Sequence, residues 1–363
     1  MRKVLFNLHL YAALFVGVFV VIIGVTGSIM AFEEDLDRLF NPTLFNVQPL
    51  GVPLSAAGML KAAATAYPGQ KVNMLRLPQG STDSASFVVR GPKQVFLNPY
   101  NGQILGERSP ATALSTIHSM HLRLLMGPPG GDVVASVTGV LLFLVLSGIY
   151  LWWPQKRGTV KWRASAWRVN FDLHNAVGIY SAIFLLALGI TGIVIHFDND
   201  IEQFLHKTAG TAKVTKNVPS VVQPGVSPIT PDQAIQNALA ALPGTKPLLI
   251  AIPANPKGSY LVAIRYPEDL TPGGRSWANV DQYSGKVVNL QSSRTVAAGT
   301  RTIIINRAIH TGDIFGYPTK ILVALSSLML ISQAITGYYM WWKKLRSRQG
   351  RQADVNVVGE SVA

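Results

Sequence analysis

The segment from Asp172 to Asp200 carries no charged residue between His174 and His196. About 20 apolar residues make one helical crossing of a bilayer core of about 30 Å, so the segment predicts a membrane-spanning helix. The two histidines are 22 residues apart, which at about 1.5 Å per residue separates them by roughly 33 Å. At about 100° per residue they differ by roughly 40° around the helix axis. One imidazole is therefore expected at each membrane face, on nearly the same side of one helix.

Three other uncharged runs are long enough to span a bilayer: Leu10 to Phe32, Val133 to Trp153 and Ile321 to Trp342. The chain is 48% hydrophobic and only 14% charged, which is too apolar for an ordinary soluble domain. The first run is too long for the apolar part of a signal peptide, and SIMAFEE is a poor cleavage site. We therefore expect a retained anchor and four spans in total.

The short segments between the spans are basic, and they set the predicted orientation. Twelve of the 32 basic residues lie in three of them, namely Arg2 and Lys3, then Lys156, Arg157, Lys161, Arg163 and Arg168, then Lys343, Lys344, Arg346, Arg348 and Arg351. The positive-inside rule makes that side cytoplasmic. Both termini are then cytoplasmic and two large segments lie outside. Topology accounts for the net charge of +14, so no nucleic-acid partner is needed.

The two halves of the sequence repeat each other. NLHLYAALFVG aligns with DLHNAVGIYSA and pairs His9 with His174, while later offsets pair His121 with His310. The alignment keeps its order along the chain, as a tandem repeat does. Two parallel span–module–span units are predicted, related by a pseudo-two-fold axis along the membrane normal.

Each outer segment is predicted to be a small α+β module of one helix and about three antiparallel strands. Ser55 and Thr230 are suitable helix N-caps. NPYNG and DQYSG predict hairpin turns at Asn101-Gly102 and Ser284-Gly285.

Six histidines are expected at two membrane depths. His9 and His174 meet at the inner face, whereas His118, His121, His196 and His310 gather at the outer face, where the stretches before the second and fourth spans lie along the interface. His206, in a polar stretch without a repeat partner, is expected at the surface.

Every span also carries a hydroxyl–glycine pair: Thr26-Gly27, Ser147-Gly148, Thr191-Gly192 and Thr336-Gly337. Such pairs are typical of close helix packing in lipid. They would also give clearance for a flat macrocycle. In spans one and three the pair lies near the outer histidines, and in spans two and four near the inner ones.

Paired imidazoles at two depths are suited to haem iron. Cysteine is absent, which excludes cysteine-ligated iron–sulfur clusters, c-type haem attachment and disulfides. A hydrolytic zinc site would need a nearby carboxylate base, and no H-E-x-x-H motif occurs. A permease would need a polar path at the midplane, where these spans are apolar.

The layout, with His9, His174 and the IHSMH and AIH segments, resembles the PepSY-associated transmembrane family over nearly the whole chain. The modules resemble PepSY domains. Within that family it is similar to inner-membrane siderophore reductases, which implies two b-type haems and reduction of a ferric siderophore or other ferric chelate in the bacterial periplasm. His9 and His174 would ligate the inner haem iron and His121 and His310 the outer one. Either His196 or His118 would be able to replace one of the outer pair.

The expected segments are span 1 at 1–32, module 1 at 33–112, an interfacial helix and span 2 at 113–153, a basic loop at 154–171, span 3 at 172–197, module 2 at 198–298, an interfacial helix and span 4 at 299–342, and a tail at 343–363. The cytoplasmic segments are too short for a flavin or nicotinamide domain, so quinol or a cytoplasmic flavoprotein would supply electrons. Two alternatives remain open: a non-enzymatic membrane protein whose modules bind a peptidase or other protein, and a siderophore or metal permease.

Overall fold

The computed structural model describes residues 1–89, 93–156, 158–216 and 218–360. Arg157 of the predicted basic loop, and the last three residues of the predicted tail, lie outside this range. The described chain divides into two compact units. The membrane unit comprises residues 1–32, 116–197 and 309–363, and the sheet unit comprises residues 33–115 and 198–308.

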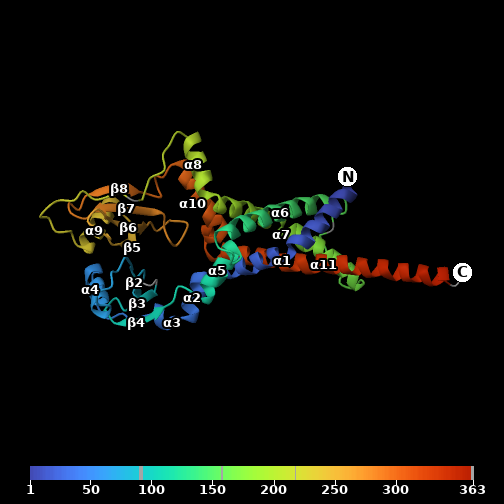
Figure 1. The fold of residues 1–363 in the computed structure, drawn as a ribbon, viewed down its shortest axis with the longest axis horizontal. Helices are drawn as coiled ribbons and strands as arrows, with labels where there is room; N and C mark the ends of the chain where they lie inside the picture. Colours follow the sequence, from blue (N-terminus) through green and yellow to red (C-terminus); the bar gives the residue numbers. More distant parts are fainter. Residues whose placement is uncertain (90–92, 157, 217, 361–363) are drawn as a thin grey trace. The chain divides into compact units, whose positions relative to one another are not determined.

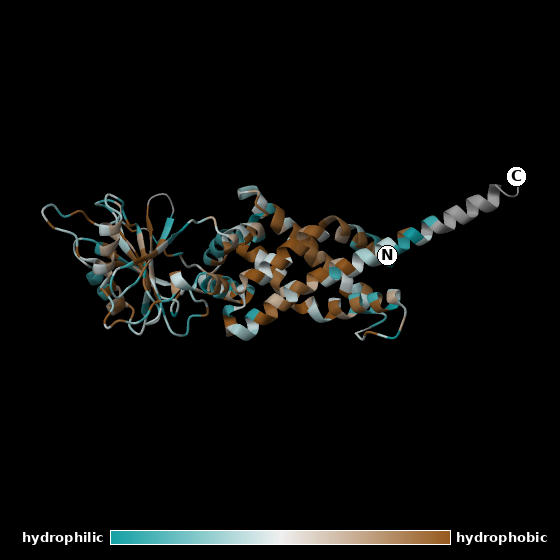
Figure 2. Cartoon of the chain, turned by 90° about the horizontal axis from the view of Figure 1, so that it is seen from below, coloured by the Kyte–Doolittle hydropathy of each residue, from teal (hydrophilic) through white to brown (hydrophobic). Residues whose placement is uncertain are grey.

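Four long apolar helices form the membrane unit, as predicted: α1 (Arg2–Met30), α6 (Pro128–Trp152), α7 (Ala166–His196) and α11 (Tyr317–Glu360). Figure 2, coloured by residue hydropathy, shows that these helices are hydrophobic over most of their length. The helices pack in the ring α1–α6–α7–α11, which closes between α11 and α1. All four begin earlier than the apolar runs do. In α1 and α7 the added residues include arginine and lysine, which are good helix formers. Helix α11 likewise continues through the basic residues that follow Trp342.

The middle of the bundle is apolar and tightly packed. Val16 and Val20 of α1 pack with Val137 of α6, Leu185 of α7 and Leu330 of α11. Small residues bring helix backbones close together, as is usual in lipid. The hydroxyl of Ser28 on α1, for example, donates to the carbonyl of Ala324 on α11 at 3.0 Å.

The helices α5 (Ala113–Arg123) and α10 (Ala298–Thr311) carry the segments that precede the second and fourth spans. Residues 124–127 separate α5 from α6. Leu124 and Leu125 adopt positive φ angles there, and Pro128 begins α6, where its missing N–H costs nothing. A short 3₁₀ helix, η1 (Asp313–Phe315), separates α10 from α11.

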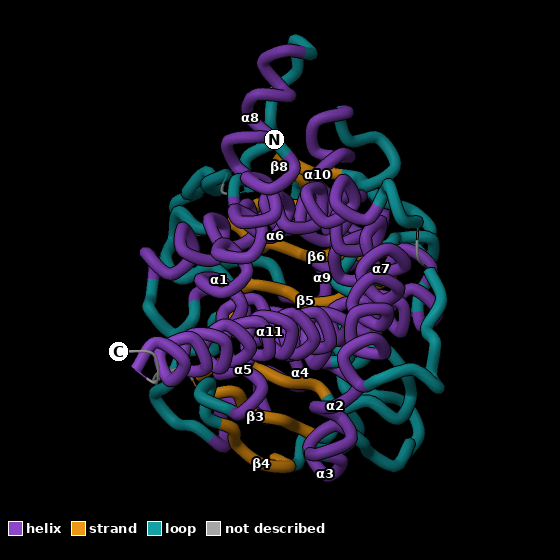
Figure 3. The backbone as a smooth tube through the Cα atoms, turned by 90° about the vertical axis from the view of Figure 1, so that its right-hand side faces the viewer, coloured by secondary structure: helices purple, strands orange, loops and turns teal. Residues whose placement is uncertain are grey.

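The sheet unit differs from the prediction in two respects. Each half supplies four strands, and all eight form one antiparallel sheet in the order β4-β3-β2-β1-β5-β6-β7-β8. Strand β1 pairs with β5, so the two modules are joined edge to edge. The strands (Figures 1 and 3) are β1 (Met74–Arg76), β2 (Ala85–Val89), β3 (Lys93–Leu97), β4 (Ile104–Arg108), β5 (Lys246–Ala251), β6 (Ser259–Arg265), β7 (Ser276–Asp281) and β8 (Val287–Gln291).

One helix from each half covers the same face of the sheet. Helices α4 (Ala56–Ala66) and α9 (Pro231–Ala241) pack on alternate strand residues such as Phe87, Val262 and Val280, which are almost fully buried. The predicted N-caps are confirmed: Ser55 accepts from the N–H of Gly58, and Thr230 forms a capping box with Gln233. The carboxylate of Asp232 on α9 accepts from the N–H groups of Ala56 and Ala57, which ties the two helices together.

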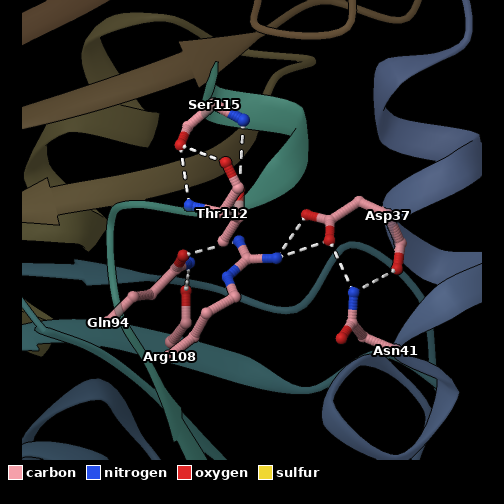
Figure 4. A network of polar contacts seen from close by, with 7 residues as sticks. Asp37, Asn41, Gln94, Arg108, Thr112 and Ser115 are labelled. Atoms are coloured by element: carbon pink, nitrogen blue, oxygen red, sulfur yellow. Dashed lines mark hydrogen bonds and ion pairs between the residues drawn. The ribbon is translucent and has the colours of Figure 1, made fainter. Parts of the chain in front are cut away.

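A half-buried ion pair anchors the helix that follows the first span. Helix α2 (Glu33–Phe40) is followed by α3 (Pro42–Phe45), and Nη1 of Arg108 on β4 donates to Oδ2 of Asp37 on α2 at 2.6 Å. Figure 4 shows Arg108 between Asp37 and Gln94 of β3, with Asn41 bonded to the same aspartate. The corresponding helix in the second half is α8 (Asp198–Thr208).

Candidate functional site

His9 is fixed by a hydroxyl on the neighbouring helix α6. Its Nδ1 lies 2.8 Å from Oγ of Ser147, and a Cβ added to Gly148 would lie 3.5 Å from its Cε1. The Ser147 hydroxyl has one proton and donates it to the carbonyl of Phe143 at 2.7 Å. It must therefore accept the hydrogen bond from His9, which places the imidazole proton on Nδ1. The lone pair of Nε2 remains the one that a metal can use.

His174 repeats this arrangement between α7 and α11. Its Nδ1 lies 2.8 Å from Oγ1 of Thr336, whose hydroxyl donates to the carbonyl of Ser332 at 2.6 Å. A Cβ on Gly337 would lie 3.5 Å from Cε1 of the ring. The same tautomer follows, with the proton on Nδ1.

His121, on α5, contacts the hydroxyl–glycine pair of α1. Its Nδ1 lies 3.2 Å from Oγ1 of Thr26 and 3.0 Å from the carbonyl of Ile23. A carbonyl can only accept, so Nδ1 is again the protonated nitrogen. A Cβ on Gly27 would lie 2.9 Å from the Cε1 atom of this imidazole.

His310, at the end of α10, makes the matching contact with α7. Its Nδ1 lies 2.9 Å from Oγ1 of Thr191, which donates to the carbonyl of Ala187 at 2.6 Å. A Cβ on Gly192 would lie 3.0 Å from Cε1 of His310.

The four histidines thus form two pairs related by the repeat. The ring centres of His121 and His310 are 6.4 Å apart, with an angle of 49° between the ring planes. His9 and His174 are close enough to interact electrostatically. Within the described residues, no three histidine, aspartate or glutamate side chains gather as they would around a zinc ion. The four imidazoles lie as two neighbouring pairs.

The remaining two candidates occupy different surroundings. Nε2 of His196 lies 3.0 Å from Oδ1 of Asp132, near the start of α6, and its ring packs edge-on against Phe197. His118 lies on α5 within electrostatic range of His121. The structure therefore brings His121 together with His310, whereas His196 contacts the carboxylate of Asp132.

His206 is not a surface residue, and the expectation for it is wrong. Only 4% of it is exposed, because it lies on the inward side of α8. Its Nδ1 is 2.8 Å from Oγ1 of Thr211 and its Nε2 is 3.0 Å from Oγ1 of Thr300. Thr300 in turn donates to Glu202, which also pairs with Lys213. The side chain has a structural role within the sheet unit.

The hydroxyl–glycine pairs have a role that the sequence did not disclose. Each glycine lies against an imidazole, and each hydroxyl fixes the ring that packs there. The available signal was the depth of each pair, which matches that of one pair of histidines. The sequence could not show that the pair and its histidine lie on different, contacting helices.

Comparison with known proteins agrees with this architecture. No curated protein matches the chain. The model of one protein family, described as the PepSY-associated TM region, matches residues 6–344. That match covers the apolar runs of all four spanning helices, the whole eight-stranded sheet and the four paired histidines. The chain therefore belongs to the PepSY-associated transmembrane family.

Proposed function

We propose that this protein is a transmembrane reductase that holds two b-type haems and passes electrons across the bacterial inner membrane to a periplasmic ferric chelate, such as a ferric siderophore. The observation that carries the proposal is the recurrence of one geometry at four places. Each imidazole is held through Nδ1 by a hydroxyl from another helix. Nε2 of each is thereby prepared as a metal ligand.

The spacing of the outer pair fits ligation of one iron by two imidazoles. With about 2 Å from metal to nitrogen and roughly 1.1 Å from nitrogen to ring centre, two imidazoles that bind one iron would have ring centres about 6.2 Å apart. The centres of His121 and His310 are 6.4 Å apart.

Four residues would hold the two haem irons, namely His9 with His174 and His121 with His310. A bound b-type haem supplies a one-electron couple at its iron. The hydroxyls of Ser147, Thr336, Thr26 and Thr191 orient the rings and set their tautomer. The valine, leucine and isoleucine side chains between the two depths exclude water from the bundle.

The basic segments support the proposed orientation, with both termini cytoplasmic and the sheet unit periplasmic. The His9–His174 pair then lies on the cytoplasmic side, where electrons enter from quinol or a flavoprotein. The His121–His310 pair lies on the side of the ferric chelate.

Stopped-flow spectroscopy of the haems in membranes tests the direction of flow. In the His310→Ala variant, the native donor should still reduce the inner haem, whereas reduction of a periplasmic ferric chelate should collapse. In the His174→Ala variant, the donor should leave the outer haem oxidised, although chemically reduced protein should still reduce the chelate. Donor-driven chelate reduction at the wild-type rate in His174→Ala would contradict the transmembrane path. A protein without haem would favour the non-enzymatic protein-binding role.

A further inference from the structure

A groove of about 500 Å³ opens beside the contact between α1 and α6, at the end of the membrane unit that carries the chain termini. It is lined by Arg2, Leu146, Ile149, Tyr150, Trp153 and Pro154. Leu146, Tyr150 and Trp153 are each more than half exposed on the lipid-facing side of the bundle. Binding sites for small molecules have volumes of about 300–1,000 Å³, so the groove is large enough for a single aromatic headgroup.

The groove adjoins the inner histidine site along the same helix–helix contact. Arg2 precedes His9 by seven residues, which is about two helical turns, or roughly 10 Å along α1, on nearly the same face. On α6, Ser147 holds His9, and four residues later the carbonyl of Leu151 accepts from Nη2 of Arg2 at 2.7 Å. A molecule in the groove therefore lies within about two turns of the His9 imidazole.

The groove is lined by both apolar and polar groups. Two of the lining residues, Tyr150 and Trp153, are aromatic, and Leu146 and Ile149 are aliphatic. The polar groups of the lining are the guanidinium of Arg2, with donors beyond the one used on Leu151, and the hydroxyl of Tyr150. Such a site favours a planar ring with oxygen substituents and an apolar tail. The bond to Leu151 holds Arg2 over the groove, which distinguishes it from a side chain extended toward lipid headgroups.

We infer that this groove binds an isoprenoid quinol, which donates electrons to the haem held by His9 and His174; the inference rests on the proposed function. The quinol gives up two electrons in two single steps, and the haem held by His9 and His174 would accept each of them in turn. Two protons pass to water at the cytoplasmic face and the product is the quinone. Arg2 and Tyr150 donate hydrogen bonds to the quinol oxygens, and the charge of Arg2 stabilises the singly deprotonated quinol.

The experiment uses the full chain in phosphatidylcholine nanodiscs, with decylubiquinol as reductant and an azidoquinone as photolabel. Ile149→Trp fills the groove, and Arg2→Gln removes the guanidinium. Ile183→Trp, at a lipid-facing position on α7, and Lys3→Gln are the matched controls. The haem content and the dithionite-reduced spectrum of every variant verify that the protein is folded and loaded.

We expect both groove variants to slow reduction of haem by decylubiquinol at least tenfold, while the two controls match the wild type. The photolabel should attach to the peptide around Ile149 in wild type and be displaced by unlabelled decylubiquinone. Unchanged reduction in Ile149→Trp and Arg2→Gln would overturn the inference. Displacement of the label by phosphatidylglycerol and not by decylubiquinone would identify a lipid groove and overturn it as well.

The same samples separate this inference from the proposed function. If decylubiquinol fails to reduce wild-type haem while dithionite-reduced protein still reduces a ferric chelate, the quinol site is wrong and the reductase stands. If the wild-type protein contains no haem, the reductase itself fails, and quinone labelling alone does not restore it.

Discussion

The imidazole of His174 and the hydroxyl of Thr336 lie 2.8 Å apart across the contact between α7 and α11. Because the hydroxyl proton is already donated to the carbonyl of Ser332, Thr336 can only accept from Nδ1. Thr336 thus decides which nitrogen of His174 carries the proton and which keeps its lone pair available. Residues in this second position commonly change metal affinity by about 10–100-fold when they are replaced.

The Thr336→Val variant tests that relationship. It keeps the shape of the side chain and removes the acceptor, so His174 loses the bond that fixes its tautomer. We expect haem to dissociate from the inner site about 10–100-fold faster, as measured by transfer to apomyoglobin. Thr336→Ser should restore the wild-type rate, and Ser327→Ala, at a buried position on the same helix, should not alter it. An unchanged rate in Thr336→Val would show that the hydroxyl does not orient the ring.

The four glycines predict a difference between the two sites. A Cβ at position 27 or 192 would lie 2.9 or 3.0 Å from Cε1 of the imidazole, which is closer than side chains pack. At positions 148 and 337 the same distance is 3.5 Å, an ordinary contact. Gly27→Ala and Gly192→Ala should therefore perturb the low-spin signal of the outer haem, and Gly148→Ala and Gly337→Ala should leave the inner signal intact. Equal effects at all four positions, measured by low-temperature absorbance, would contradict this packing.

Much of this fold is readable from the sequence. Four uncharged runs gave the spans, and the offset between His9 and His174 gave the repeat. The NPYNG and DQYSG sequences predicted two hairpin turns, and these turns join β3 to β4 and β7 to β8. The histidine pairs followed from the same symmetry.

Other features depend on contacts between distant segments. The pairing of β1 with β5 joins strands more than 170 residues apart, and no local pattern encodes it. The burial of His206 depends on Thr300, which comes from α10. A polar stretch in the sequence cannot reveal that its histidine finds polar partners inside the protein.

Asp281 should make the stability of the sheet depend on pH. Burial opposes its ionisation, but the N–H groups of Ser284, Val221 and Tyr283 outweigh that effect and hold its pKa below the ordinary value of 3.8. The folded state therefore favours the carboxylate, and the stabilisation is complete above that value and is lost as the pH falls through the folded pKa.

The Asp281→Asn variant tests this dependence. In the first half, the repeat-related Asn98 accepts from the N–H of Tyr100 without a charge. In the variant, an amide nitrogen would face the N–H that now donates to Oδ2, which should cost about 1–3 kcal/mol at pH 7. Hydrogen exchange of the β7 amides should become less dependent on pH between 3 and 5. If hydrogen exchange in the variant depended on pH as steeply as in the wild type, another titrating group would cause the pH dependence.

Cysteine labelling can test the proposed orientation, since the chain contains no native cysteine. Single cysteines at Ser81 and Ser227, both exposed in the sheet unit, should react with an impermeant maleimide in intact spheroplasts. A cysteine at Thr159, exposed in the segment between α6 and α7, should react only after lysis. Labelling of all three in intact cells would contradict an orientation with both termini in the cytoplasm.

The most direct test of the account is the haem content of the purified chain, measured for the wild type and for four single histidine variants. Pyridine haemochrome analysis should find two b-type haems per wild-type chain, both low-spin. His9→Ala and His174→Ala should each remove the same haem, and His121→Ala and His310→Ala should each remove the other, because a bis-imidazole iron loses its low-spin spectrum when either ligand is absent. A haem-free wild-type protein from haem-replete cells, or loss of different haems in His9→Ala and His174→Ala, would contradict the paired-imidazole sites.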